Sequence, residues 1–98
     1  MKRLRFEWDE QKAAANRRKH GLTFEEARTA FLDENALLRP DEGHSEDEDR
    51  FVLLGLSMQL RVVVVCHCYR HQDEVIRIIS ARKANSSERG QYENRRMR

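Results

Sequence analysis

The sequence predicts an α+β fold in which a short strand and two helices precede a mainly antiparallel sheet, with a further helix at the C-terminal end. Two helix start signals come early in the chain, and three stretches rich in Val, Ile, Leu and Phe follow them. The connections between these stretches have hairpin length and are too short for a parallel crossover. We therefore expect helices on one face of the sheet and a partly open surface on the other.

The N-terminal part of the chain begins with the motif LRFEW at residues 4–8, which alternates as a short strand does. Asp9 can cap a helix that continues to about His20, and Gly21 provides a stop signal. Arginines, a lysine and a histidine gather in the last turn of this helix, where they suit the negative end of the helix dipole.

A second helix start follows at once, because the motif TFEE at residues 23–26 has the pattern of a capping box. In such a box the Thr23 side chain accepts a bond from the Glu26 amide, and the Glu26 side chain accepts one from the Thr23 amide. Phe24 and Phe31 lie at helical spacing, so we expect this helix to pack by an aromatic face.

The second half of the chain predicts the sheet and the last helix. Residues 33–50 are irregular and acidic around Pro40, although Ala36–Leu38 can form a short strand. The three β-rich stretches are Phe51–Leu56, Arg61–Tyr69 and Val75–Arg82. Asn85 followed by Glu88 is another helix start, so the cationic C-terminal part is expected to be helical.

Composition places this chain among small, highly charged proteins. With 98 residues it has room for one core, and we expect a single domain over residues 1–98. Its charged share of 37% exceeds the usual ~25%. Cationic ends flank an acidic middle: residues 1–20 carry seven Lys/Arg and three Asp/Glu, residues 33–50 two and eight, and residues 77–98 seven and two. Such cationic ends attract phosphate, unless they merely neutralise the acidic segment across the surface.

The sequence favours a cytoplasmic protein with reduced thiols. No window approaches the roughly 18 apolar residues of a membrane span, and no apolar run follows the N-terminal cations as in a signal peptide. Cys66 and Cys68 lie two apart on one predicted strand, so both point to the same face and cannot face each other as a disulfide requires.

Strand parity predicts where polar side chains meet. On the stretch Arg61–Tyr69, the side chains of His67 and Tyr69 share a face. If Tyr69 pairs with Val75 on the next strand, His67 lies opposite Arg77, with their Cβ atoms roughly 5 Å apart. A one-residue slip would set His67 against an isoleucine. In the simpler alternative, His67 is a structural residue and Arg77 forms an ion pair with Asp73 or Glu74.

Histidine, arginine and tyrosine at the end of an apolar face suit a metal-free ribonuclease. Cleavage by the 2′-hydroxyl of RNA needs proton transfer to and from oxygen and cations beside the phosphate. Imidazole suits proton transfer because its ordinary pKa is near neutrality, and guanidinium can donate two bonds to a phosphate. The segment from His44 to Arg50 also holds Glu46 and Glu48, but no second histidine stands at a spacing that would fix a metal site, so we expect neither a metal nor another cofactor.

The predicted C-terminal helix is the strongest indication of nucleic-acid binding in the sequence. A helix that is polar on all sides gains little stability from packing against the rest of the protein, so its cations are available to a partner. Its cations and those just before it would form a phosphate-attracting surface, with Tyr92 one turn beyond Arg89. They are Arg82, Lys83, Arg89, Arg95, Arg96 and Arg98. The segment from Arg95 to Arg98 can equally be a frayed, solvated end.

The order of four motifs resembles the BrnT family of bacterial type II toxins over essentially the whole chain. These motifs are FEWDEQKAAANRRKHGLTFEEARTAFLD, GHSEDEDRFVLLGL, VVCHCYR and IRIISARKANSSERGQYE. The resemblance implies a RelE-like ribonuclease fold and inhibition of translation by RNA cleavage. It also implies neutralisation by a BrnA-type ribbon-helix-helix antitoxin, whose complex with the toxin represses their shared promoter and thereby brings operator DNA as an indirect partner.

The family's recurrent polar positions carry over to this chain in five groups. They are Lys19 and His20; His44, Glu48 and Arg50; His67, Tyr69 and Arg70; Arg77, Ser80, Arg82 and Lys83; and Glu88, Arg89 and Tyr92. The chain departs from the family at Cys68, where threonine is commoner, and we expect no catalytic consequence.

Together these observations predict a metal-independent endoribonuclease toxin. Arg77 and Arg82 would clamp phosphate, His67 or His44 would transfer protons, and Glu48 would act as a base or orient a histidine. The RNA would be bound by Arg50, Tyr69, Lys83, Arg89 and Tyr92. The alternative is a non-catalytic nucleic-acid-binding module that uses the same basic surface, and a third reading gives that surface chiefly to an acidic antitoxin segment.

Overall fold

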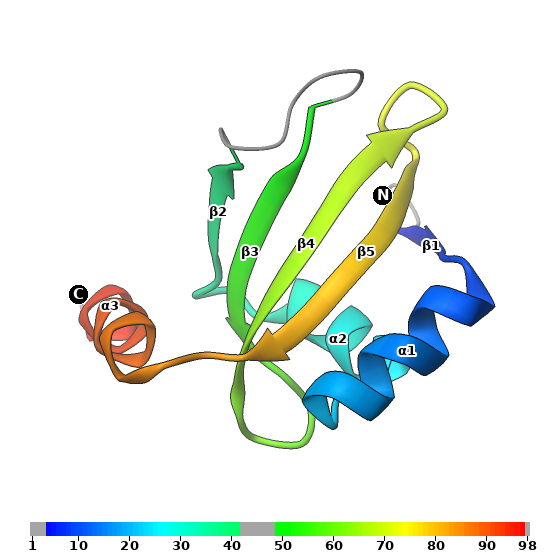
Figure 1. Cartoon of the computed structure of the whole chain (residues 1–98). Coiled ribbons are helices and arrows are strands. Elements are labelled where there is room, and N and C mark those ends of the chain that lie inside the picture. The colour runs from blue at the N-terminus through cyan, green and yellow to red at the C-terminus, as the bar shows by residue number, and fades with distance from the viewer. Residues whose placement is uncertain (1–3, 42–48, 98) are drawn as a thin grey trace.

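The computed structural model describes residues 4–41 and 49–97, which form a five-stranded mixed sheet and three α-helices (Figure 1). The elements are β1 (Arg5–Glu7), α1 (Glu10–His20), α2 (Phe24–Thr29), the 3-10 turn η1 (Ala30–Leu32), β2 (Leu37–Pro40), β3 (Phe51–Leu56), β4 (Val62–Arg70), β5 (Val75–Lys83) and α3 (Ser86–Arg96). The strand order is β1-β5-β4-β3-β2, with β1 parallel to β5 and the other pairs antiparallel. None of these helices is long and apolar enough to cross a membrane.

The helix ends follow from their capping residues. Asp9 accepts bonds from the first turn of α1, and Gly21 closes the helix at φ 67°, in the left-handed region. Thr23 caps α2 as predicted. The Glu26 side chain, however, binds outside the helix, so only half of that predicted capping box forms. The reciprocal box forms instead at α3, between Asn85 and Glu88.

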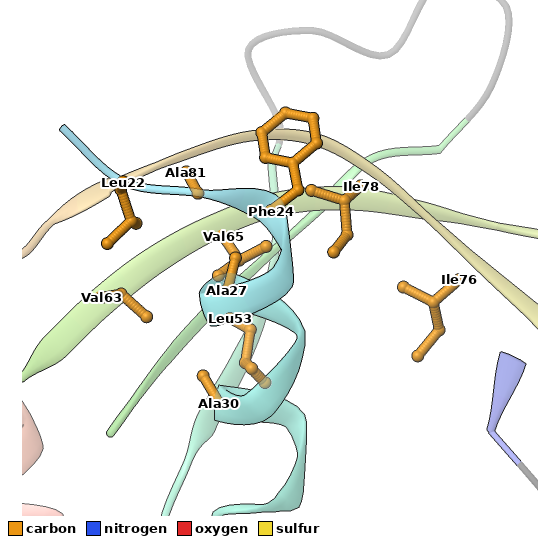
Figure 2. Close-up of a cluster of buried hydrophobic side chains, with 10 residues drawn as sticks. All are labelled: Leu22, Phe24, Ala27, Ala30, Leu53, Val63, Val65, Ile76, Ile78 and Ala81. Carbon is orange, nitrogen blue, oxygen red and sulfur yellow. The ribbon is translucent and has the colours of Figure 1, made fainter. Parts of the chain in front are cut away.

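Helices pack against both faces of the sheet, which corrects the expectation that they share one. The face that packs on α1 and α2, here called the helical face, holds the larger core (Figure 2). Its fully enclosed side chains include Leu22 and Phe24 from the helical side and Val63 and Val65 from β4. The opposite face, here called the α3 face, is covered by α3 only in part.

One aromatic side chain fixes α3 to the sheet. Tyr92 is 1% exposed and packs with Leu54 and Val64 on the α3 face. Its hydroxyl donates to Asp33 Oδ2 at 2.6 Å, and the same oxygen accepts the Leu56 amide at 2.8 Å. Burial, together with the Asp33 carboxylate, raises the pKa of Tyr92 to about 12. The helix is therefore anchored by its single buried side chain, although the rest of its surface is polar.

A polar clamp holds the far half of β5. Strand β1 pairs with β5 only from Val75 to Arg77, so the later residues of β5 have no strand on that side. Asn16 of α1 replaces it: its amide nitrogen donates to Ala81 O at 2.9 Å and to Leu22 O at 3.0 Å. Its amide oxygen accepts the Ala81 amide at 3.0 Å, as a neighbouring strand would.

A second clamp ties the hairpin between β3 and β4 to α2. The Glu26 carboxylate accepts two bonds from the Arg61 guanidinium, both at 2.7 Å, and a third from the Ser57 hydroxyl at 2.7 Å. The Arg61 hydrogen bond holds the pKa of Glu26 below its usual range, against the opposing effect of burial. This well-connected carboxylate is a structural group.

Replacing Asn16 by Ala should lower the free energy of unfolding by about 2–3 kcal/mol, because three hydrogen bonds are lost and Ala81 keeps two buried backbone groups without partners. Urea denaturation followed by circular dichroism measures the change. The matched control is Asn94→Ala on the exposed surface of α3. Equal effects of the two substitutions would refute the clamp.

Replacing Glu26 by Gln should reduce the pH dependence of stability. A carboxyl whose folded pKa is lowered stabilises the fold above its unfolded pKa, and this contribution is lost as the pH falls through the folded pKa. The stability gap between Glu26→Gln and the parent should thus be largest at pH 7 and shrink below about pH 5. Urea midpoints across this range test it, with exposed Glu25→Gln as control; a gap that is independent of pH would contradict the assignment.

Candidate functional site

The central hairpin has a different register from the one predicted. His71, Gln72 and Asp73 all adopt left-handed backbone angles, with φ of 54°, 57° and 69°, and this tight turn lets Arg70 pair with Val75. Tyr69 therefore pairs one residue later than expected, with Ile76. The shift places Cys68, rather than His67, opposite Arg77. The prediction that His67 and Arg77 share a face is wrong: they lie on opposite sides of the sheet.

His67 is a buried structural histidine on the helical face. It is 0% exposed, and its Nδ1 donates to the Val65 carbonyl at 3.0 Å, so Nε2 is left to accept from the Tyr69 hydroxyl at 3.3 Å. Its ring lies between Phe31 and Phe51, with centroids 4.8 and 6.2 Å away. Burial lowers the pKa of His67, which keeps the imidazole neutral. Enclosed in this way, His67 cannot contact a phosphate, which corrects its predicted role.

The helical face also carries an acidic pocket near Tyr69, with a volume of about 540 Å³. It is lined by Leu38, Asp49, Phe51, Tyr69 and Asp73. Burial, with a further contribution from Asp73, raises the pKa of Tyr69. The two carboxylates that line this pocket repel a polyanion, so the surroundings of Tyr69 do not suit RNA.

The α3 face carries a more cationic depression, here called the groove, with a volume of about 580 Å³. Its floor comes from β3, β4 and β5, and its sides come from α3, from the end of α1 and from the residues that flank the β2–β3 connection. The lining residues are His20, Asp41, Arg50, Val52, Val64, Cys66, Ile79, Ser80, Ala81, Arg82 and Glu88. Two of the predicted site residues, Arg50 and Arg82, line this cavity together.

A β-bulge brings polar side chains of β5 into the groove. Cys66 pairs with Ser80, whereas the next residue, His67, pairs with Ile78, so β5 contains one extra residue between these pairs. Simple alternation puts Ser80 and Arg82 on the same side as Ile78, which is buried in the helical-face core. The bulge reverses this alternation and turns both side chains toward the α3 face.

The guanidinium of Arg82 is held in place by α3. It donates to the two carboxylate oxygens of Glu88 at 2.8 and 2.9 Å, in bidentate geometry. The Arg82 hydrogen bond lowers the pKa of Glu88, and a bond from the Asn85 amide adds to this effect. The Arg82 side chain is still 44% exposed, so this oriented cation faces the solvent of the groove.

Arg77 lies on the α3 face but binds elsewhere. It donates to Glu7 Oε2 at 2.7 Å, and the same oxygen lies 3.9 Å from Arg70 Nε. Arg77 therefore pairs with a residue of β1, and not with Asp73 or Glu74, the partners considered from the sequence. Arg77 and Arg82 are five residues apart, about 16 Å along a strand, and are held by different carboxylates. They do not form the single phosphate clamp that was predicted.

The remaining predicted residues fall into three classes. Arg50 lines the groove, while Lys83 is exposed at the end of β5 and Arg89 is exposed at the start of α3, where it donates to Ala84 O at 2.8 Å. Tyr92 is buried under α3, so its predicted contact with RNA is corrected. His44 and Glu48 lie outside the described residues.

The groove is also lined by polar residues to which the sequence assigned no catalytic or RNA-binding role, among them His20, Asp41 and Cys66. His20 lies at its edge, and Cys66 donates to Asp41 Oδ2 at 3.7 Å on its floor. Burial raises the pKa of the Cys66 thiol, and the Asp41 carboxylate adds to this effect. The family resemblance had named His20 without a role. Its spacing of four residues from Asn16 puts both side chains on one face of α1, toward the edge of β5 that Asn16 binds.

The described residues contain no group of three His, Cys, Asp or Glu side chains that could hold a metal ion. Neither Cys66 nor Cys68 forms a disulfide, as expected, and both pair with β5 residues of the α3 face.

Comparison with known proteins identifies the family. The model of the ribonuclease toxin BrnT of type II toxin–antitoxin systems matches residues 8–88. The 1.1 Å crystal structure of the Brucella abortus ribonuclease toxin BrnT has a similar fold, with a TM-score of 0.65 and 24% sequence identity over 86% of this chain and 100% of that one. A search of curated proteins gave no match. Because the family model spans most of its length, the chain belongs to the BrnT family of ribonuclease toxins of type II toxin–antitoxin systems.

Proposed function

We propose that this protein is an endoribonuclease that inhibits translation by cleaving RNA in the groove on the α3 face. The observation that carries the proposal is the Arg82 guanidinium, which is oriented by Glu88, is 44% exposed and lines the same cavity as Arg50. An oriented guanidinium can donate to phosphate oxygens as charge develops on them, without further reorganisation. Membership of a family of ribonuclease toxins supports the same chemistry.

The proposed reaction is metal-independent attack of the 2′-hydroxyl on the adjacent phosphorus. Arg82 offsets the negative charge that grows on the phosphoryl oxygens, a task that a bound cation performs in other nucleases, and Arg50 adds positive charge to the same cavity. Lys83 and Arg89, which are both exposed, hold the RNA on either side of Arg82. Arg77 contributes a more distant backbone contact, and His44 and Glu48 remain proposed contributors to proton transfer.

The proposed biological setting is a cytoplasmic toxin–antitoxin pair. Its antitoxin would be a BrnA-type ribbon-helix-helix protein that neutralises the toxin, and the complex would repress the shared promoter through operator DNA. The proposal also includes that the fold is RelE-like. The support is membership of the type II family together with the cationic surface, which suits an acidic antitoxin segment as well as RNA.

A non-catalytic nucleic-acid-binding module is the competing function, because the same cations would hold RNA without cleaving it. Incubation of the purified protein with end-labelled RNA and a chelator separates the two functions. Shortened products in the chelator support the proposed enzyme, whereas a shifted but intact band supports the binder. Parallel reactions with and without ribosomes show whether cleavage needs a translating ribosome.

Replacing Arg82 by Gln should slow RNA cleavage about 10²-fold, which is the usual effect of removing one donor to a developing oxyanion. Glu88 can still cap α3 through the Asn85 amide, so the fold should be retained. Single-turnover cleavage of a short labelled RNA measures the rate, and circular dichroism checks the fold. The control is Arg28→Gln on the exposed surface of α2. Cleavage by a folded Arg82→Gln variant at the rate of the control would remove Arg82 from the site.

A further inference from the structure

His20 lies where α1 meets the unpaired edge of β5. Asn16, one helical turn earlier, is fixed to both backbone groups of Ala81. Because residues i and i+4 share a helix face, His20 is directed to the same edge of the sheet, about one turn further along. No strand of the described chain covers this edge, since β1 ends its pairing at Arg77. His20 is accordingly one of the residues that line the groove, although α1 packs on the helical face.

Among the described residues, the groove offers few other groups that can exchange a proton at neutral pH. The Glu88 carboxylate is occupied by Arg82 and the Asn85 amide, and its pKa is lowered. The Cys66 thiol is half-buried, and its pKa is raised, so it stays protonated. Arginines hold their protons throughout the physiological range. Asp41 accepts a bond from Cys66, while His20 is half-buried and has an imidazole, the side chain best suited to gain and lose protons near neutrality.

We propose that His20 is a catalytic residue of the proposed ribonuclease reaction and shuttles one proton between two oxygens of the substrate. The neutral imidazole accepts the proton of the 2′-hydroxyl as the bond from the 2′ oxygen to phosphorus forms. The resulting imidazolium returns that proton to the 5′ oxygen as the bond from phosphorus to this oxygen breaks. The products are a 2′,3′-cyclic phosphate and a 5′-hydroxyl, and the enzyme ends in its starting protonation state.

This inference rests on the proposed function and adds to it an imidazole from the described part of the chain. His67 is enclosed on the helical face, whereas His20 opens into the same cavity as Arg82 and Arg50. The groove thus combines a proton-transfer group with cations for the phosphate, which is the minimum set for metal-free cleavage. Each comes from a different element: α1 supplies His20, β5 supplies Arg82, and the start of β3 supplies Arg50.

The test is single-turnover cleavage by His20→Ala with and without free imidazole. The substitution should slow cleavage by about 10²-fold or more at saturating protein, and imidazole in the buffer should restore a substantial part of the rate. Rescue is diagnostic, because a merely structural histidine would not be replaced by a diffusing imidazole. The matched control is His71→Asn, which removes an exposed imidazole from the β4–β5 turn and keeps a residue type that tolerates its positive φ. That control should cleave like the parent.

Three outcomes would overturn the inference, and they are distinguishable from failure of the proposed function. A parent protein that cleaves RNA, with His20→Ala within twofold of it, excludes His20 alone. A slow but folded His20→Ala variant that imidazole does not restore also excludes the proton shuttle. A parent protein that binds RNA and never shortens it overturns the proposed function, and the role of His20 with it.

Discussion

The β-bulge in β5, held in place by the Asn16 clamp, is the constraint on which the functional surface depends. The extra residue between Ile78 and Ser80 reverses strand alternation, so Arg82 faces the groove instead of the apolar core. Asn16 binds both backbone groups of Ala81, immediately beyond the bulge, and so fixes the strand where no other strand supports it. The same helix carries His20. One interaction between α1 and β5 therefore positions two groups of the groove.

Carboxylates control the orientation of the cations on the α3 face. Glu88 holds the guanidinium of Arg82 in bidentate geometry, while Glu7 holds Arg77 toward β1. The two ion pairs hold Arg77 and Arg82 apart, although these arginines are only five residues apart in the sequence. Arg82 is the one that lines the groove with its guanidinium held in bidentate geometry. Since Glu88 also completes the capping box of α3, the start of that helix and the direction of Arg82 depend on the same side chain. Tyr92 then secures the helix through Asp33.

Local signals in the sequence predicted the elements well, because caps and strand propensities act over a few residues. Asp9, Gly21 and Asn85 mark helix ends as expected, and the three long strands begin within one residue of their predicted starts. The site was harder to predict because an error of one residue in strand register changes the face of every later side chain. The tight turn of left-handed residues shifted the pairing partner of His67 by one position, and the bulge then moved the Arg82 side chain to the other face of the sheet. Neither the turn at residues 71–73 nor the bulge at residues 78–80 contains a glycine or proline that would indicate it in the sequence. His20 was named only as a recurrent polar position of the family, and its place at the groove could not be predicted because it depends on how α1 packs against β5.

The most direct test of the central claim is where RNA binds. Titration of the isotope-labelled protein with a 2′-O-methyl oligoribonucleotide, which lacks the nucleophile for cleavage, would map the contact surface by amide chemical-shift changes. The account predicts that the largest changes occur at His20, Cys66 and Arg82, around the groove, and weaken as salt is added. Largest changes at Phe51, Tyr69 and Asp73, around the acidic pocket on the helical face, would contradict it.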